Sequence, residues 1–201
     1  RLLRDAGASV NQAAADGTTP LRAASQEGKI DCVWLMIAAG AAVNQADSDG
    51  VTPLLVACQE GHHSCTQVLL EASAAVSQAA KDGCTPLYVA CENGHLECAQ
   101  LLRDAGAAVN QAKPNGVTPL YIACEKGHLE CAQLLRDAGA AVNQARNDGT
   151  TPLFITCQEG HLECVRLLLE AGAAIDQADE QGATPLFAAC QDGHLEVAKL
   201  L

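Results

Sequence analysis

A Thr-Pro-Leu triplet returns at a fixed interval of 33 residues along the chain. Its six copies begin at Thr19, Thr52, Thr85, Thr118, Thr151 and Thr184. A fixed period of this length predicts a stack of similar small units, because a single unit cannot bury its apolar face alone and must pack against its neighbours. We therefore expect structural and binding features to recur from unit to unit.

The period divides the 201 residues into one array. Counting from Asp16 gives five complete units between two partial ones, namely 1–15, 16–48, 49–81, 82–114, 115–147, 148–180 and 181–201. Residues 1–3 and 199–201 fall at the same place in the unit, inside a predicted helix. We therefore expect the chain to be part of a longer array, or to lack the polar end units that repeat stacks carry.

Each unit predicts a tight turn followed by two short antiparallel helices. Asp-Gly and Asn-Gly pairs mark the turn, because glycine adopts positive φ without steric cost. The threonine of Thr-Pro-Leu is suited to cap the first helix, with proline at the first helical position. Gly127 and Gly139 stand where the first and second helices should end. The expected fold is an all-α solenoid of helix-turn-helix units with protruding β-turn or hairpin tips.

One unit departs from the pattern in two places. His63 stands in an otherwise aliphatic column, and Ser73 replaces the glycine that ends the second helix. Both changes should reduce stability, because a polar ring meets an apolar site and a side chain meets a glycine conformation. We expect local opening of the stack to begin around residues 60–77.

These motifs resemble the ankyrin repeat. The resemblance rests on the 33-residue period with Gly-x-Thr-Pro-Leu, Gly-His-Leu-Glu, Leu-Leu and Gly-Ala-x-Val-Asn, and it covers all 201 residues. The family's histidine after Thr-Pro-Leu, which helps to tie loops together, is replaced here by Arg22, Leu55, Tyr88, Tyr121, Phe154 and Phe187. The resemblance implies a non-catalytic protein-binding scaffold and leaves open how these loops are held.

Charge and composition narrow the kinds of partner. With 24 acidic and 12 basic residues the formal charge is −12, which disfavours nucleic acid and anionic membrane surfaces. The longest strongly apolar run, residues 33–43, has 11 residues, whereas a membrane helix needs about 20. We expect a soluble monomer that binds a protein or peptide.

The first helices are expected to line a concave groove, as the resemblance implies. Helical spacing places Leu120, Ala123 and Cys124 on the core side, with Ile122 and Glu125 opposite. The groove residues expected to contact a partner form aromatic, aliphatic and acidic ladders: Tyr88, Val89, Glu92, Tyr121, Ile122, Glu125, Phe154, Ile155, Glu159 and Phe187. An acidic groove with an apolar floor suits a basic, partly apolar peptide or protein surface.

Several alternatives stay open. The aromatic and aliphatic ladders could pack against neighbouring units, and exposed acids are ordinary on a solvated surface. The turn tips, whose residues vary between units, are a second candidate surface: Asp49, Val51, Asp82, Asn115, Val117 and Asp148. Residues 94–112 and 127–145 have the same sequence, which also fits a structural spacer or an engineered, consensus-like array without a ligand.

The cysteines follow the repeat as well. Ten of the 11 stand in two columns, and Cys-x3-His-x2-Cys, a set of zinc-binding residue types, occurs four times, starting at Cys58, Cys91, Cys124 and Cys157. Because these columns need small buried side chains, and the histidine resembles the family's structural Gly-His, we expect packing residues and no metal.

Reduced cysteines favour the cytoplasm or nucleus. Cys84, which falls at a turn tip, is the expected exposed thiol. The chain shows no nucleotide-binding or hydrolase motif, so neither enzyme activity nor a cofactor is expected.

Overall fold

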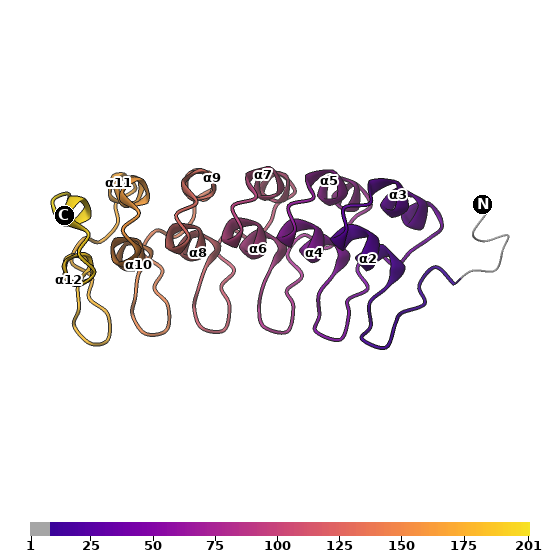
Figure 1. Cartoon of the computed structure of the whole chain (residues 1–201), viewed down its shortest axis with the longest axis horizontal. Helices are drawn as coiled ribbons and strands as arrows, with labels where there is room; N and C mark the ends of the chain where they lie inside the picture. The colour runs from indigo at the N-terminus through magenta and orange to yellow at the C-terminus, as the bar shows by residue number, and fades with distance from the viewer. Residues whose placement is uncertain (1–8) are drawn as a thin grey trace. The chain divides into compact units, whose positions relative to one another are not determined.

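The computed structural model describes residues 9–201, and the helix end expected at residues 1–3 lies outside that range. The described part consists of paired helices without a strand (Figure 1). The helices are α2 (Pro20–Gln26), α3 (Ile30–Ala38), α4 (Pro53–Gln59), α5 (His63–Glu71), α6 (Pro86–Glu92), α7 (Leu96–Asp104), α8 (Pro119–Glu125), α9 (Leu129–Asp137), α10 (Pro152–Glu159), α11 (Leu162–Glu170), α12 (Pro185–Gln191) and α13 (Leu195–Ala198). The predicted all-α fold is confirmed. In residues 9–201, no helix has both the length and the apolar character needed to cross a membrane.

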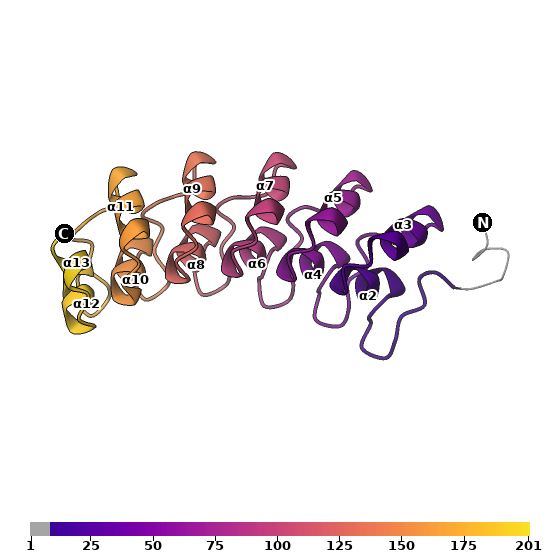
Figure 2. The same ribbon diagram turned by 45° about the horizontal axis from the view of Figure 1, so that its top comes forward.

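Contacts group the chain into two compact bodies, which are described separately. Of the described residues, the N-terminal body comprises 9–90 and 97–107, and the C-terminal body comprises 91–96 and 108–201. In the N-terminal body, α2 packs against α3 and α4, and α5 packs against α3 and α4. In the C-terminal body, α10 packs between α8 and α12, and α11 between α9 and α13 (Figure 2). The division into 33-residue units stays a prediction.

The first helices begin as the Thr-Pro pairs predict. The Thr118 hydroxyl accepts a hydrogen bond from the backbone N–H of Tyr121 at 3.1 Å, and Thr151 accepts one from Phe154 at 3.1 Å. Each cap satisfies an N–H group that a helix start leaves unpaired. Helices of seven or eight residues are too short to be stable alone, so they depend on these caps and on packing.

Helices α4, α8 and α10 are buried on nearly every side, which corrects the two-sided helix expected from spacing. Residues 119–124 of α8 are all buried, with Tyr121 at 0% exposure, and residues 152–157 of α10 are buried too. Helix α10 shows the cause, because α8, α12 and its own partner α11 contact it from three sides. Only the last residues of such a helix reach solvent.

Histidines just before four of the second helices link consecutive helix pairs. Each Nε2 lies 2.9 to 3.1 Å from a backbone carbonyl of the preceding pair: His62 with Gln26, His128 with Glu92, His161 with Glu125 and His194 with Gln158. A carbonyl oxygen can only accept, so Nε2 carries the proton and donates it in each bond. The expected structural role of the Gly-His motif is confirmed.

The ring of each of these histidines also packs over a glycine of the preceding pair. A Cβ added to Gly127 would lie 2.6 Å from Nδ1 of His161, and Gly127 has φ +71°. Gly139 has a similar φ of +82°, but nothing lies within 4 Å of the place a Cβ would take. Two constraints therefore require glycine at residue 127, namely the positive φ and the contact with the His161 ring. At Gly139 only the positive φ requires it.

Ser73 adopts the left-handed conformation that glycine adopts in the equivalent places, with φ 65°. A side chain in this region costs roughly 1 kcal/mol. His63 is exposed, and its Nε2 lies 3.2 Å from the Ser64 hydroxyl. The opening of residues 60–77 stays a prediction, with backbone strain at Ser73 as a physical cause.

Gly127→Ala should destabilise the protein more than Gly139→Ala. Both changes place alanine at positive φ, at a cost of about 1 kcal/mol, and Gly127→Ala also pushes against the His161 ring, for about 1 to 2 kcal/mol more. Denaturant unfolding of both variants measures the two free energies of unfolding. Equal losses would contradict the contact between the histidine ring and Gly127.

Candidate functional site

Carboxylates gather where the first helices of the C-terminal body end. Glu92, Glu125 and Glu159 are the last residues of α6, α8 and α10, and Asp192 directly follows α12. Glu92 and Glu125 are half-buried, and Glu159 and Asp192 are exposed. We call these four residues the acidic rim. The helix dipole opposes a carboxylate at a helix C-terminus by about 0.3 to 1 kcal/mol, so the acidic rim does not serve helix stability.

The apolar residues of the predicted groove lie mostly in the interior. Six of them are buried, at 9% exposure or less: Tyr88, Val89, Tyr121, Ile122, Phe154 and Ile155. Phe187, on α12, is 56% exposed. Burial favours the packing alternative for the six residues and removes the expected apolar floor at those positions.

Tyr121 ties a loop from within the core. Its hydroxyl lies 3.1 Å from the Thr150 hydroxyl, which donates to Oδ1 of Asp148 at 2.6 Å. Since the threonine hydroxyl has one proton, Tyr121 donates to Thr150. Arg146 pairs with the same Asp148 carboxylate. Burial raises the pKa of Tyr121, which keeps its hydroxyl a donor at neutral pH.

Arg22 has the corresponding role in the N-terminal body. Its guanidinium lies 2.9 Å from the Asp47 carboxylate and donates to the Gln26 side chain at 3.1 Å. Arg22 and Tyr121 thus supply long polar side chains that reach a loop 25 and 29 residues further on. They show how two of these loops are held without the family's histidine.

The turn tips are tied internally and to one another. Side-chain oxygens of Asp82 and Asn115 accept the backbone N–H of Cys84 and Val117. Backbone carbonyls of three tips accept an N–H of the next tip: Asp49 from Lys81, Asn115 from Asn147 and Asp148 from Glu180. Of the predicted tip contacts, Asp49, Asp82 and Asn115 are exposed, Val51 and Asp148 are half-buried, and Val117 is buried. Val117 is therefore corrected to a packing residue.

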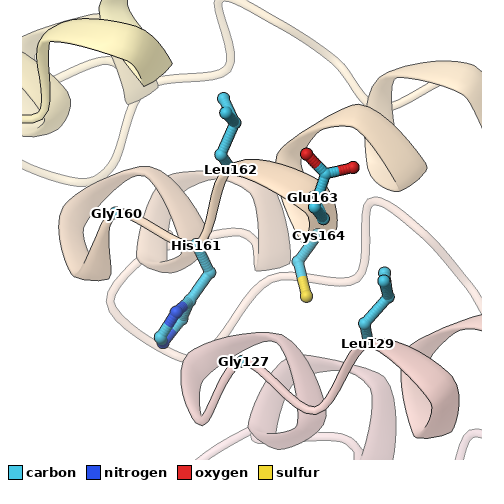
Figure 3. Close-up of a pocket in the computed structure, with 7 residues that line it drawn as sticks. All are labelled: Gly127, Leu129, Gly160, His161, Leu162, Glu163 and Cys164. Carbon is cyan, nitrogen blue, oxygen red and sulfur yellow. The ribbon is translucent and has the colours of Figure 1, made fainter.

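The histidines and cysteines point to different places. Figure 3 shows the His161 ring directed toward Gly127, and its Nε2 is bonded to the Glu125 carbonyl. Burial raises the pKa of Cys157 to about 12 and of Cys164 to about 11, so both are neutral thiols at pH 7, whereas zinc binds thiolate. Among residues 9–201, no three such side chains are grouped to hold a metal ion.

A shallow hollow of about 290 Å³ lies beside this histidine (Figure 3). It is lined by Gly127, Leu129, Gly160, His161, Leu162, Glu163 and Cys164. One repeat further on, a hollow of about 280 Å³ is lined by Gly160, Leu162, Gly193, His194, Leu195, Glu196 and Val197. Because the hollow recurs with equivalent residues, it follows from the register of the stacked pairs and does not mark a specialised ligand site.

The expected order of thiol exposure is wrong. Cys84 is half-buried, and its Sγ lies 3.0 Å from Oδ2 of Asp82, whereas Cys32 and Cys190 are exposed. Cysteines in the helices are covered by neighbouring helix pairs, and these two belong to the first and last described pairs.

The Asp148 carboxylate should titrate well below its usual range. The hydrogen bond from Arg146, helped by Thr150, lowers its pKa from 3.8 to about 2. Since the folded pKa is below the unfolded one, this group stabilises the fold above about pH 4, and the contribution is lost between about pH 4 and 2. The contribution is small, because 40% of the side chain is exposed.

Carboxyl NMR titration tests this, with Arg146→Gln expected to raise the pKa of Asp148 toward 3.8. An Asp148 pKa that is the same in the parent and in Arg146→Gln would contradict the role of Arg146.

Comparison with known proteins agrees with this architecture. The family described as "Ankyrin repeats (3 copies)" matches residues 1–78, 72–146 and 138–201. The crystal structure of the human ASB11 ankyrin repeat domain is 33% identical with a TM-score of 0.84, covering 91% of this chain and 82% of that chain. No curated protein matches. With its 33-residue period, Thr-Pro helix starts and Gly-His links, the chain belongs to the ankyrin repeat family.

Proposed function

We propose that this chain is a non-catalytic scaffold that binds a basic, partly apolar peptide or protein surface along the acidic rim. Ankyrin repeats are in general protein–protein interaction modules and typically not enzymes. The observation that carries the proposal is the row of carboxylates at the ends of successive first helices, where they do not stabilise the helices.

The remaining exposed residues of the predicted surfaces supplement the acidic rim. Phe187 on α12 offers an apolar contact beside Asp192. Asp49, Asp82 and Asn115 at the tips offer further polar contacts. The formal charge of −12 favours a basic partner through long-range attraction. We further propose a reducing compartment, cytoplasm or nucleus, because the 11 cysteines are free.

A structural spacer is the second candidate. It is favoured by the identical sequences of residues 94–112 and 127–145 and by the burial of the aromatic ladder. A spacer, or an engineered array, needs no exposed contact residues and would bind neither peptides nor proteins.

Charge-neutralised variants test the acidic rim. The rim variant is Glu125→Gln, Glu159→Gln and Asp192→Asn. The control variant is Glu130→Gln, Glu163→Gln and Glu196→Gln, three exposed acids at the starts of second helices in the same repeats. Both variants change the net charge equally. The probe is a labelled peptide of alternating lysine and leucine, read by fluorescence anisotropy.

The parent should bind the peptide, and the rim variant should bind it about ten-fold more weakly, since three ion pairs at the surface contribute roughly 1 to 2 kcal/mol together. The control variant should keep the parent's affinity. Equal weakening in both variants would show attraction by net charge alone and contradict the acidic rim. Absence of binding to the parent would favour the spacer.

A further inference from the structure

Two buried cysteines of the N-terminal body contact the same buried hydroxyl. Cys58 lies in α4, Cys98 in α7 and Thr66 in α5. The Thr66 Oγ1 is 3.6 Å from the Cys58 Sγ and 3.6 Å from the Cys98 Sγ. Each of the three residues is exposed by 1% or less. The fold therefore brings two thiols from consecutive helix pairs into one small polar cluster.

Thr66 distinguishes this cluster from the equivalent places in the stack. The 33-residue period repeats the cysteine pair twice: Cys91 with Cys131, and Cys124 with Cys164. The column of Thr66 is otherwise apolar in the described repeats: Val33, Ala99, Ala132, Val165 and Ala198. A buried hydroxyl costs free energy unless it is hydrogen-bonded, and here the two thiols are its partners. The second helix beside the paired cysteines thus supplies a hydroxyl at Cys58 and Cys98 but not at the other two pairs.

The hydrogen bonds make the two thiols unlike each other. A hydrogen bond with Cys58, helped by one with Thr66, lowers the pKa of Cys98 against the effect of burial. Burial raises the pKa of Cys58 well above its usual range. In the equivalent pair of the C-terminal body, burial raises the pKa of Cys164 to about 11 and also raises that of Cys124. Because the thiolate is the form that attacks an oxidant, Cys98 is the most reactive of these four thiols.

The helix beside the cluster is also the one with a strained end. Ser73, just beyond α5, has φ 65°, whereas Gly139, which is equivalent to it beyond α9, has φ 82° without a side chain. A side chain at positive φ favours transient opening of the segment that carries it. Opening of residues 60–77 admits a small oxidant, since Thr66 of this segment contacts the Cys98 Sγ.

We propose that Cys58 and Cys98 are a disulfide site that hydrogen peroxide oxidises, joining α4 to α7 of the next helix pair. The Cys98 thiolate attacks one peroxide oxygen, the O–O bond breaks, and the released hydroxide takes up the thiol proton as water. The Cys58 sulfur then attacks the Cys98 sulfur of the resulting sulfenic acid, and the S–O bond breaks as the S–S bond forms. The hydroxide leaves with the Cys58 proton as a second water. The two thiols together lose two electrons, which reduce one peroxide to two waters.

The disulfide closes a loop that contains the strained segment. Residues 60–77 lie between Cys58 and Cys98 in the sequence. A cross-link at the ends of this stretch restricts its open states more than its folded state. Oxidation therefore stabilises α5, and a dithiol reductant such as dithiothreitol reverses the effect.

Peroxide treatment of the folded chain tests the site. The reduced parent is exposed to hydrogen peroxide, the remaining thiols are blocked with N-ethylmaleimide in denaturant, and peptide mapping by mass spectrometry identifies the cross-links. The disulfide between Cys58 and Cys98 should form at least about ten-fold faster than one between Cys124 and Cys164. Hydrogen exchange in α5 should slow after oxidation and recover with dithiothreitol. Equal rates for the two pairs, or oxidation of Cys98 without a cross-link to Cys58, would overturn the proposal.

Two reciprocal substitutions test how peroxide reaches the thiols. Ser73→Gly removes the strain beyond α5, so cross-linking of Cys58 to Cys98 should slow about five-fold. Gly139→Ser places the same strain beyond α9, where nothing lies within 4 Å of the added Cβ. It should accelerate cross-linking of Cys124 to Cys164 by a similar factor. Unchanged rates in both variants would contradict access through opening of the second helix.

Two further variants test the order of the steps, and each has a precedent in the chain. Cys58→Ser copies Ser25, which is buried in the same column, and Cys98→Val copies the buried Val197. In Cys58→Ser, peroxide should leave a sulfenic acid on Cys98 that dimedone labels. In Cys98→Val, Cys58 should be labelled at least about ten-fold more slowly. Faster labelling of Cys58 than of Cys98 would contradict Cys98 as the residue that peroxide oxidises first.

Discussion

The hydrogen bond from a histidine Nε2 to a carbonyl of the preceding helix pair sets the register of each body. In the C-terminal body His161 reaches Glu125 at 3.0 Å while its ring covers Gly127. Asparagines add a second link, as Asn110 Oδ1 accepts the N–H of Ala141 at 2.8 Å. Because helices of seven to nine residues are unstable alone, they depend on packing, on their caps and on these links between pairs.

The packing between consecutive helix pairs also determines which side chains remain exposed for binding. Stacking covers the aromatic and aliphatic ladders and leaves the last residues of the first helices in solvent. The acidic rim therefore lies where α8 and α10, which are otherwise buried, reach solvent.

Much of the fold could be predicted from the sequence, because turns, caps and helix-ending glycines are local signals. Ser73 is an example, since its position in a column of glycines predicts a positive φ, and the observed φ is 65°. The burial of Tyr121 could not be predicted from helical spacing, which separates two faces of an isolated helix, whereas a stacked first helix is contacted from three sides. The one sequence feature that indicates the hydrogen-bonding role of Tyr121 is Thr150, whose hydroxyl lies 29 residues further along the chain.

Hydrogen exchange in a His161→Leu variant tests most directly whether the histidine link holds consecutive helix pairs together. The bond joins the start of α11 to the end of α8, so exchange should accelerate on both sides, at the backbone N–H of Lys126 as well as in α11. The free energy of opening that protects these N–H groups should fall by about 1 kcal/mol, the contribution of one hydrogen bond. Faster exchange confined to α11, with Lys126 as protected as in the parent, would contradict the coupling of neighbouring pairs.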